Sequence, residues 1–210
     1  MTTILITNDS IPSTDFANVV EATKRFLAKF APAWKMSVEI TLDANAKHDM
    51  IVHITEANRH PSATGYHGVS ALVPTSWCSP RAAGRIYGHY AKALMSKGKM
   101  IHPESFTPGL VTTVCHEIAE MLVDPVIANY SAVDPQGRHW LIEVADHVFG
   151  VFALEVVAGN NCVLPDCTTP AFYDRAGKAP FSIYGGATAP FTMTSKGYGY
   201  YKGATGLVKI

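Results

Sequence analysis

The residues with the clearest potential for chemistry lie between Val114 and Pro125, where the sequence reads VCHEIAEMLVDP. On a helix, side chains four positions apart share a face, so His116 and Glu120 can point at one atom. Glu117 lies about 100° around the helix axis from His116, beside that atom. An imidazole and a carboxylate are common ligands of a divalent cation, and a neighbouring carboxylate can take a proton from water. The segment therefore predicts a cation site formed by His116 and Glu120, with Glu117 as general base.

This spacing matches the HExxH zinc helix, with glutamate in place of the second histidine. The acidic residues also lie late in the predicted helix, where the helix dipole disfavours negative charge. Glu117, Glu120 and Asp124 fall within eight residues of a charge-poor chain, and a divalent cation would supply their counter-charge. The alternative is a solvated helix on which Glu117 and Glu120 are ordinary surface acids. Asp124, which precedes Pro125, is expected to cap the helix or brace a loop rather than to bind the cation.

A third ligand is expected from the later segment WLIEVADH, residues 140–147. Glu143 and Asp146 share a face if this segment forms a helical turn. We expect Glu143 to be the third ligand, with Asp146 either as an alternative ligand or as an acceptor that orients the ligand imidazole. The alternative is that both acids only cap a loop.

The elements that must position these residues follow from the spacing of the apolar residues. Apolar positions at helical spacing from Asp15 predict a first helix that ends at Pro32. The order strand, helix, three strands, then helices indicates an α+β fold with a mixed sheet rather than a strict alternation of strands and helices. Strands are predicted at 3–7, 36–42, 50–55, 67–74 and 151–157, and further helices at 82–96 and 109–123.

The character of the chain changes after residue 150. The stretch 165–202 is rich in glycine, proline and aromatic residues, which predicts short strands and turns. We expect residues 1–150 to form the metal-binding domain. Residues 151–210 are expected to be an irregular, β-rich extension packed on that domain rather than an independent unit.

The His116-Glu117-x-x-Glu120 helix resembles that of the zincin metallopeptidases, and the order strand, helix, three strands and helix resembles their N-terminal subdomain. In that scaffold the strand nearest the cleft pairs with extended substrate, and residues 67–74 occupy the matching place. The longer string HExxExxxDP, the later ExxD and a closing segment around Tyr198 resemble a group of mostly uncharacterised bacterial and bacteriophage proteins. A similar string occurs in exordium-like secreted proteins.

The resemblance implies a zinc-dependent metallopeptidase-like protein, in which a metal-activated water attacks a peptide carbonyl with Glu117 as general base. It implies His116 and Glu120 as ligands and Glu143 as the third ligand. We expect His67 to be a substrate-binding residue if it lies in the cleft. One histidine and two carboxylates nearly neutralise a divalent cation, so we expect hydrolysis at neutral pH to be slow or absent. Oxygen-rich coordination brings Mn²⁺ or Ca²⁺ into consideration, although the imidazole favours Zn²⁺.

The composition bears on partners and location. Lysine plus arginine and aspartate plus glutamate number 17 each, which excludes a generic electrostatic nucleic-acid binder or a polybasic membrane-surface protein. Only 16% of the residues are charged, against about 25% in an ordinary soluble domain, so we expect a protein assembly or homo-oligomer. Without a basic, signal-like start or a span of about 20 apolar residues, we expect a cytoplasmic or virion location and no membrane segment.

Other candidate groups carry weaker signals. The four cysteines are expected to be reduced thiols, with a bridge between Cys162 and Cys167 as the alternative. Cys115 is expected to be a buried thiol rather than a nucleophile, because neighbouring helical residues diverge. Either His67 or His147 could stabilise an oxyanion if it lies in the cleft, and the tyrosines near Tyr198 could donate to a transition state or simply pack.

Two main functions remain open from the sequence. The first is the metallopeptidase, whose substrate would be a peptide or protein. The second is a virion structural or assembly subunit that keeps the fold and metal with little or no hydrolysis. A carbohydrate-binding module based on aromatic side chains is a third alternative.

Overall fold

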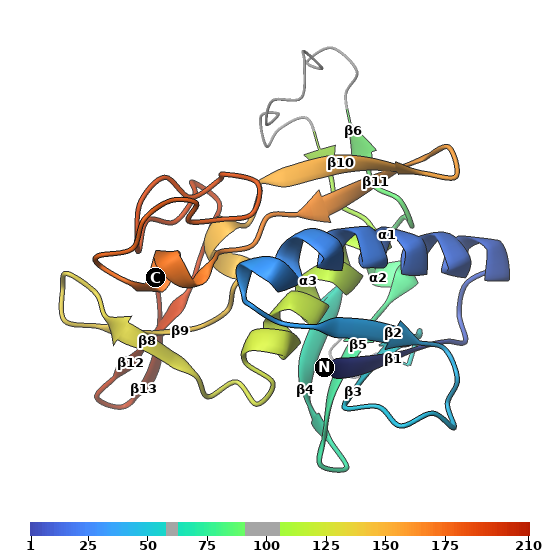
Figure 1. The fold of residues 1–210 in the computed structure, drawn as a ribbon, viewed down its shortest axis with the longest axis horizontal. Coiled ribbons are helices and arrows are strands. Elements are labelled where there is room, and N and C mark those ends of the chain that lie inside the picture. The colour runs from blue at the N-terminus through green and yellow to red at the C-terminus, as the bar shows by residue number, and fades with distance from the viewer. Residues whose placement is uncertain (58–62, 91–105) are drawn as a thin grey trace.

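The computed structural model describes residues 1–57, 63–90 and 106–210, which form a mixed α/β fold with few helices. Its main sheet has five strands (Figure 1). Four of them are parallel, and only the edge strand β4 runs antiparallel. In spatial order the strands are β2 (Val38–Thr41), β1 (Thr2–Asn8), β3 (Met50–Ile54), β5 (Val73–Cys78) and β4 (Gly65–Ser70).

The first helix, α1 (Ser13–Ala33), follows β1 as the apolar spacing predicts. Its buried face includes Phe26 and Phe30, whose rings stack 5.5 Å apart. Pro32 lies in the last helical turn instead of ending the helix before it. The expected helix is therefore confirmed, with an end one residue beyond the proline.

The single strand expected over 67–74 is wrong, because the chain turns back at Ala71 and Leu72. Both residues have positive φ values, 48° and 70°, and they join β4 to β5 as a two-residue hairpin. Such turns usually carry glycine or asparagine, so this one has no local sequence signal. The hairpin places β4 at the free edge of the sheet.

The helix expected over 82–96 is also wrong in its described part. A helical turn, α2 (Pro80–Ala83), ends at Gly84, whose φ of 73° is left-handed and forms the C-cap. The chain then extends into β6 (His89–Tyr90), which pairs with β7 (Phe106–Thr107). Residues 91–96 lie outside the described residues.

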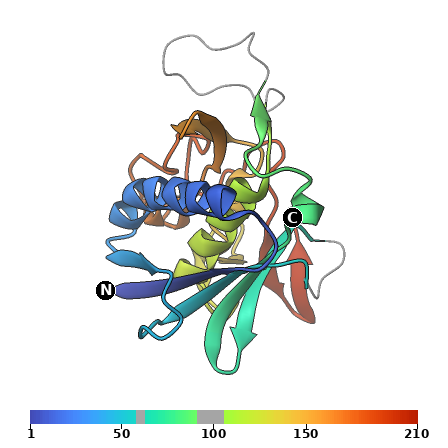
Figure 2. The same ribbon diagram turned by 90° about the vertical axis from the view of Figure 1, so that its right-hand side faces the viewer.

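The helix expected over 109–123 is confirmed as α3 (Leu110–Val123). Its apolar residues, including Val114 and Ile118, are buried between α1 and strands β4 and β5. Both α1 and α3 lie on the same face of the main sheet (Figure 2). The N–H of Gly109 donates to Thr112 Oγ1, which satisfies a donor at the start of the helix.

The rest of the chain adds three β-hairpins and irregular segments. A hairpin of β10 (Phe152–Val157) and β11 (Asn160–Pro165) packs on α1 and α3. Two short 3₁₀ turns cover Asp146–Val148 and Pro170–Tyr173. A four-stranded sheet has the order β13 (Gly206–Lys209), β12 (Tyr200–Gly203), β9 (His139–Leu141) and β8 (Tyr130–Val133).

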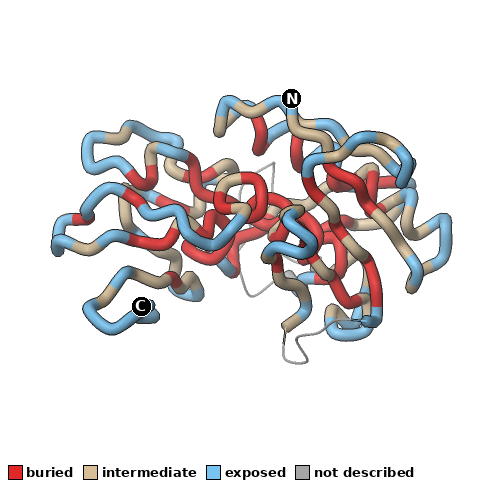
Figure 3. Tube along the Cα trace, turned by 90° about the horizontal axis from the view of Figure 1, so that it is seen from below, coloured by how far each residue is buried: buried red, intermediate tan, exposed pale blue. Residues whose placement is uncertain are grey.

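Buried segments gather in the middle of the molecule, while exposed segments lie toward its periphery (Figure 3). All four cysteines are buried free thiols, so the Cys162–Cys167 bridge is absent. The thiol of Cys115 is buried, as expected, and burial raises its pKa. Among the described helices, none is both long and apolar enough to cross a bilayer.

Candidate metal centre

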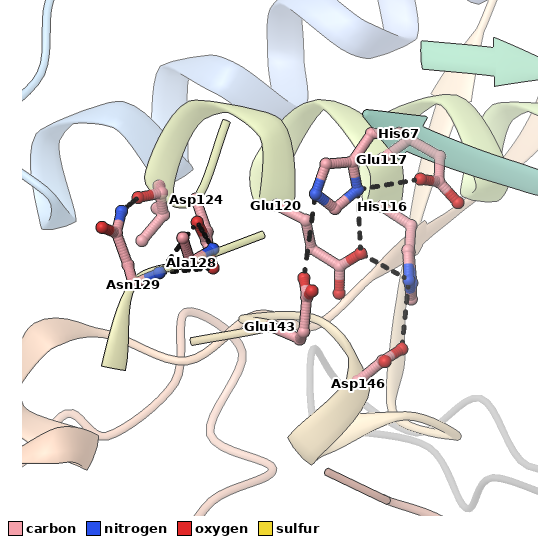
Figure 4. Close-up of polar contacts among 10 residues, drawn as sticks. His67, His116, Glu117, Glu120, Asp124, Ala128, Asn129, Glu143 and Asp146 are labelled. Atoms are coloured by element: carbon pink, nitrogen blue, oxygen red, sulfur yellow. Dashed lines mark hydrogen bonds and ion pairs between the residues drawn. The ribbon is translucent and has the colours of Figure 1, made fainter. Parts of the chain in front are cut away.

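Helix α3 brings His116 and Glu120 together, one turn apart, as its spacing predicts. The Nε2 atom of His116 lies 3.2 Å from Oε2 of Glu120 and 3.2 Å from Oδ1 of Asp146 (Figure 4). Asp146 belongs to the 3₁₀ turn that starts after Glu143. These three side chains form one group of donor atoms close enough to hold a single metal ion.

A second group forms around His67, which β4 contributes from the opposite wall. Its Nδ1 atom lies 3.4 Å from Oε2 of Glu117 and 3.8 Å from Oε2 of Glu120. Its Nε2 atom lies 4.0 Å from Oε2 of Glu143. The imidazole therefore lies between Glu117 and Glu143 (Figure 4). The donor atoms of His67, Glu117 and Glu120 are close enough to hold a metal ion, so Glu120 is shared by both groups, whereas Glu143 lies beside them.

Almost all of this cluster is buried. Glu117, Glu120, Glu143 and Asp146 are each less than a tenth exposed, so the interpretation as surface acids on a solvated helix is wrong. Several of the buried polar atoms have no hydrogen-bond partner among the described residues. These atoms are His67 Nε2, Glu120 Oε1, Glu143 Oε2 and Asp146 Oδ1. Buried polar atoms normally have partners, so these atoms are available to an ion, another ligand or ordered water.

The electrostatics of the cluster indicate an excess of negative charge. Burial, together with the nearby carboxylates of Glu120 and Asp146, raises the pKa of Glu143 to about 10. Burial alone would lower the pKa of His116, but Glu120 and Asp146 raise it well above its usual value. Without a metal, protons must supply the positive charge that the carboxylates require. A divalent cation would replace those protons.

Two cavities open onto these residues. One, of about 270 Å³, is lined by all the members of both groups and by Tyr198 and Leu207. The other, of about 390 Å³, has a largely uncharged lining that includes Phe149. The two cavities share Gly65, His116, Glu117 and Tyr198, and we call them together the groove. His116 and Glu117 therefore face both halves of the groove.

The close approach of β4 to α3 depends on Gly65. A Cβ atom at this position would lie 2.5 Å from Cγ2 of Thr113 and 2.9 Å from Cγ of Glu117. Only glycine lets the edge strand pass this near the helix, and this approach brings His67 to Glu117.

The other sequence candidates fall outside the donor groups. Asp124 is fully buried and accepts hydrogen bonds from the N–H groups of Ala128 and Asn129, which confirms it as a loop brace (Figure 4). His147 is enclosed by aromatic rings, and burial lowers its pKa to about 4. Its Nδ1 atom lies 2.9 Å from the Tyr173 hydroxyl.

Sequence reasoning missed two relationships. It placed His67 in the cleft as a substrate-binding residue but did not foresee its contacts with Glu117 and Glu143, which are separated from it by 50 and 76 positions. It also left open whether Tyr198 only packs or takes part in catalysis. This residue lines both cavities, and Asp146 lines the smaller of them. Burial and the charge of Asp146 raise the pKa of Tyr198, so its hydroxyl stays protonated at neutral pH.

The buried histidine, glutamate and aspartate side chains can hold a metal ion, and their unpartnered atoms fit that role. The distances favour Asp146 over Glu143 as the partner of His116 and Glu120. Comparison with known protein families, curated proteins and solved structures finds no match to this chain.

Proposed function

We propose that this protein is a zincin-like, metal-dependent peptidase. The observation that carries the proposal is the position of Glu117, which lies beside the His116, Glu120 and Asp146 donors and faces both halves of the groove. A peptide bond held across the groove would contact both the carboxylate of Glu117 and the cation held by His116 and Glu120 of the same helix, α3. When bound, the cation would polarise the carbonyl and make water more acidic.

The chain's own residues can be given roles in this scheme. Glu117 accepts the proton of the attacking water and later passes it to the leaving nitrogen. The N–H of His67 donates to Glu117 and holds its carboxylate in place. The hydroxyl of Tyr198, which remains protonated, can donate to the oxygen that gains negative charge. Phe149 packs edge-on against the ring of His116, with 6.4 Å between the two ring centroids, and this contact restrains the orientation of the imidazole.

The order of elements supports the zincin-like part of the proposal. The helix that carries the HExxE residues follows a sheet of order β2-β1-β3-β5-β4, whose edge strand β4 borders the groove through Gly65 and His67. This arrangement agrees with the resemblance inferred from the sequence, in which the strand nearest the cleft pairs with extended substrate. The groove and the free strand edge together fit an extended peptide or protein segment.

Zinc is the proposed cation because His116 offers an imidazole nitrogen. The carboxylates of Glu120 and Asp146 leave Mn²⁺ as the main competitor. A near-neutral ligand set of one histidine and two carboxylates predicts slow turnover rather than none.

The test uses tag-free protein loaded with Zn²⁺ and an unfolded protein substrate such as casein. We expect cleavage that a zinc chelator abolishes and that added Zn²⁺ restores. Glu117→Gln should lower kcat by about 10²–10⁴-fold while the zinc content stays the same. Glu21→Gln, on the exposed face of α1, is the matched control. Full activity in Glu117→Gln would contradict the role given to this residue.

A second candidate, an assembly subunit that uses the cation only for stability, is favoured by apolar side chains at two sheet edges. Val69 on β4 and Leu207 on β13 are about half exposed, at 49% and 51%. Edge strands with exposed apolar side chains are prone to pair with other chains. Under this candidate, Glu117→Gln would leave assembly unchanged and the zinc-loaded parent would show no cleavage.

A further inference from the structure

His67 is the least explained member of the cluster. It is 8% exposed, and its Nε2 atom has no hydrogen-bond partner among the described residues. That atom lies 4.0 Å from Oε2 of Glu143, for which the described part of the chain also offers no hydrogen-bond partner (Figure 4). Two buried atoms at this distance, neither of which has a hydrogen-bond partner among the described residues, can both contact one small ligand.

The tautomer of His67 follows from its other ring nitrogen. The Nδ1 atom contacts the carboxylate of Glu117 at 3.4 Å, and an ionised carboxylate can only accept a hydrogen bond. The proton of a neutral imidazole therefore lies on Nδ1, which leaves the lone pair on Nε2. A histidine whose N–H donates to a carboxylate while its other nitrogen is free has the arrangement that is usual for metal ligands.

The negative charge of the cluster also indicates that more than one cation can bind there. Glu117, Glu120, Glu143 and Asp146 can contribute four negative charges to one cavity. One divalent cation on the His116 side would cancel two of them. None of the described residues that line this cavity is a lysine or an arginine. A second divalent cation would balance the remaining charge, and uncompensated buried charge is costly.

We propose that a second divalent cation binds between Nε2 of His67 and the carboxylate of Glu143, with Glu120 shared between the two cations. The centre is then dinuclear. Glu120 is suited to bridge because its Oε2 lies 3.2 Å from Nε2 of His116, while its Oε1 has no hydrogen-bond partner among the described residues and is available to the second cation. Glu117 stays uncoordinated and orients His67, so it remains the general base. This inference rests on the proposed function for its first cation.

The experiment counts bound metal. Tag-free protein is stripped with chelator, dialysed against Zn²⁺ and analysed for zinc per chain by mass spectrometry. We expect two equivalents in the parent protein. His67→Ala and Glu143→Gln should each retain one equivalent, and circular dichroism checks that both variants fold. Glu143→Gln is nearly isosteric, so it keeps the test decisive if His67→Ala does not fold.

Two controls separate the proposed site from its neighbours. Glu117→Gln should keep two equivalents, because this residue touches only the Nδ1 side of His67. His139→Ala, which removes an exposed histidine of β9, should also keep two. Mn²⁺-loaded parent protein should show a spin-coupled paramagnetic resonance spectrum, whereas Glu143→Gln should show that of an isolated ion.

Each other outcome has a distinct meaning. One equivalent in the parent, unchanged in His67→Ala and Glu143→Gln, overturns the second site and leaves the proposed function standing. Loss of an equivalent in Glu117→Gln but not in Glu143→Gln also overturns it, because the ion would then bind on the Nδ1 side. No bound metal in the parent contradicts both the dinuclear centre and the proposed function.

Discussion

The Nε2 atom of His116 lies 3.2 Å from Oε2 of Glu120, one turn later on α3. Asp146 places its Oδ1 at the same 3.2 Å from that nitrogen. Donors bound about 2.1 Å from one tetrahedral ion are separated by roughly 3.4 Å, so these contacts need little adjustment to accept zinc. The helix spacing sets the first pair, and the 3₁₀ turn after β9 supplies the third donor.

Tyr198 should contribute to turnover without contributing to cation binding. Tyr198 lines both halves of the groove, and Tyr198→Phe removes its hydroxyl, so we expect kcat to fall by about 100-fold with the zinc content unchanged. Tyr201→Phe, on the neighbouring strand β12, is the control and should have near-parental kcat. An unchanged kcat in Tyr198→Phe would assign this side chain to packing alone.

Two glycines of β4 give a matched pair of variants. Gly65→Ala puts a Cβ atom against Thr113 and Glu117, so we expect a loss of about 1–3 kcal/mol in the free energy of unfolding and weaker cation binding. In Gly68→Ala the new Cβ atom meets no atom of the described residues within 4 Å, so this variant should be close to neutral on both measures. Chemical denaturation and zinc binding check the pair. Equal behaviour of the two variants would show that β4 can retreat from α3 at no cost.

The cation-free protein should lose stability as pH rises. The pKa of Glu143 is raised to about 10 in the folded chain, so this carboxyl stays protonated there when the unfolded chain has already released its proton. Its stabilising effect is complete below about pH 4.3 and is lost as pH increases toward 10. The slope is at most about 1.4 kcal/mol per pH unit for one proton.

Glu143→Gln should flatten this dependence in denaturation curves measured from pH 5 to 9. Part of the slope should remain, because the raised pKa of His116 acts in the same direction. Glu21→Gln serves as the control, since its side chain is 47% exposed on α1. A slope in Glu143→Gln equal to that of the parent would contradict the protonated carboxyl.

Asp134 should stabilise the β8–β9 hairpin in the opposite pH range. Burial alone would raise its pKa, but donors from Arg138 and Trp140 lower it to about 2. The stabilisation is therefore complete above about pH 3.9 and is lost as pH falls toward 2. Asp134→Asn should cost about 2 kcal/mol at pH 7 by denaturation, whereas Asp43→Asn, in an exposed turn, should cost little. Equal stability of Asp134→Asn and the parent would argue against this role.

The parts of the fold that sequence predicts well are those with a repeated apolar pattern. Helices α1 and α3 have apolar side chains at helical spacing over three or more turns, and their bounds agree closely with expectation. The two errors are at turns. Ala71 and Leu72 adopt positive φ without glycine, whereas Gly84 ends a helix that its neighbours favour.

The same difference between local patterns and long-range contacts applies to the candidate site. His116, Glu117 and Glu120 share one helix, so local geometry predicts their mutual placement. The contact between His67 and Glu117 depends on the β4–β5 hairpin and on Gly65, neither of which leaves a local sequence signal. Tyr198 reaches the groove from the irregular segment before β12, where no periodicity indicates the direction of a side chain.

The measurement that most directly tests the central claim is zinc-dependent thermal unfolding of the parent, His116→Ala and Glu120→Gln. At a zinc concentration 100 times Kd, ligand linkage predicts about 2.7 kcal/mol of stabilisation, which raises Tm by roughly 5–10 °C in a chain of this size. We expect this rise in the parent and in His139→Ala, and little or none in the two helix variants. An equal rise in His116→Ala, or no rise in the parent, would contradict a metal centre on α3.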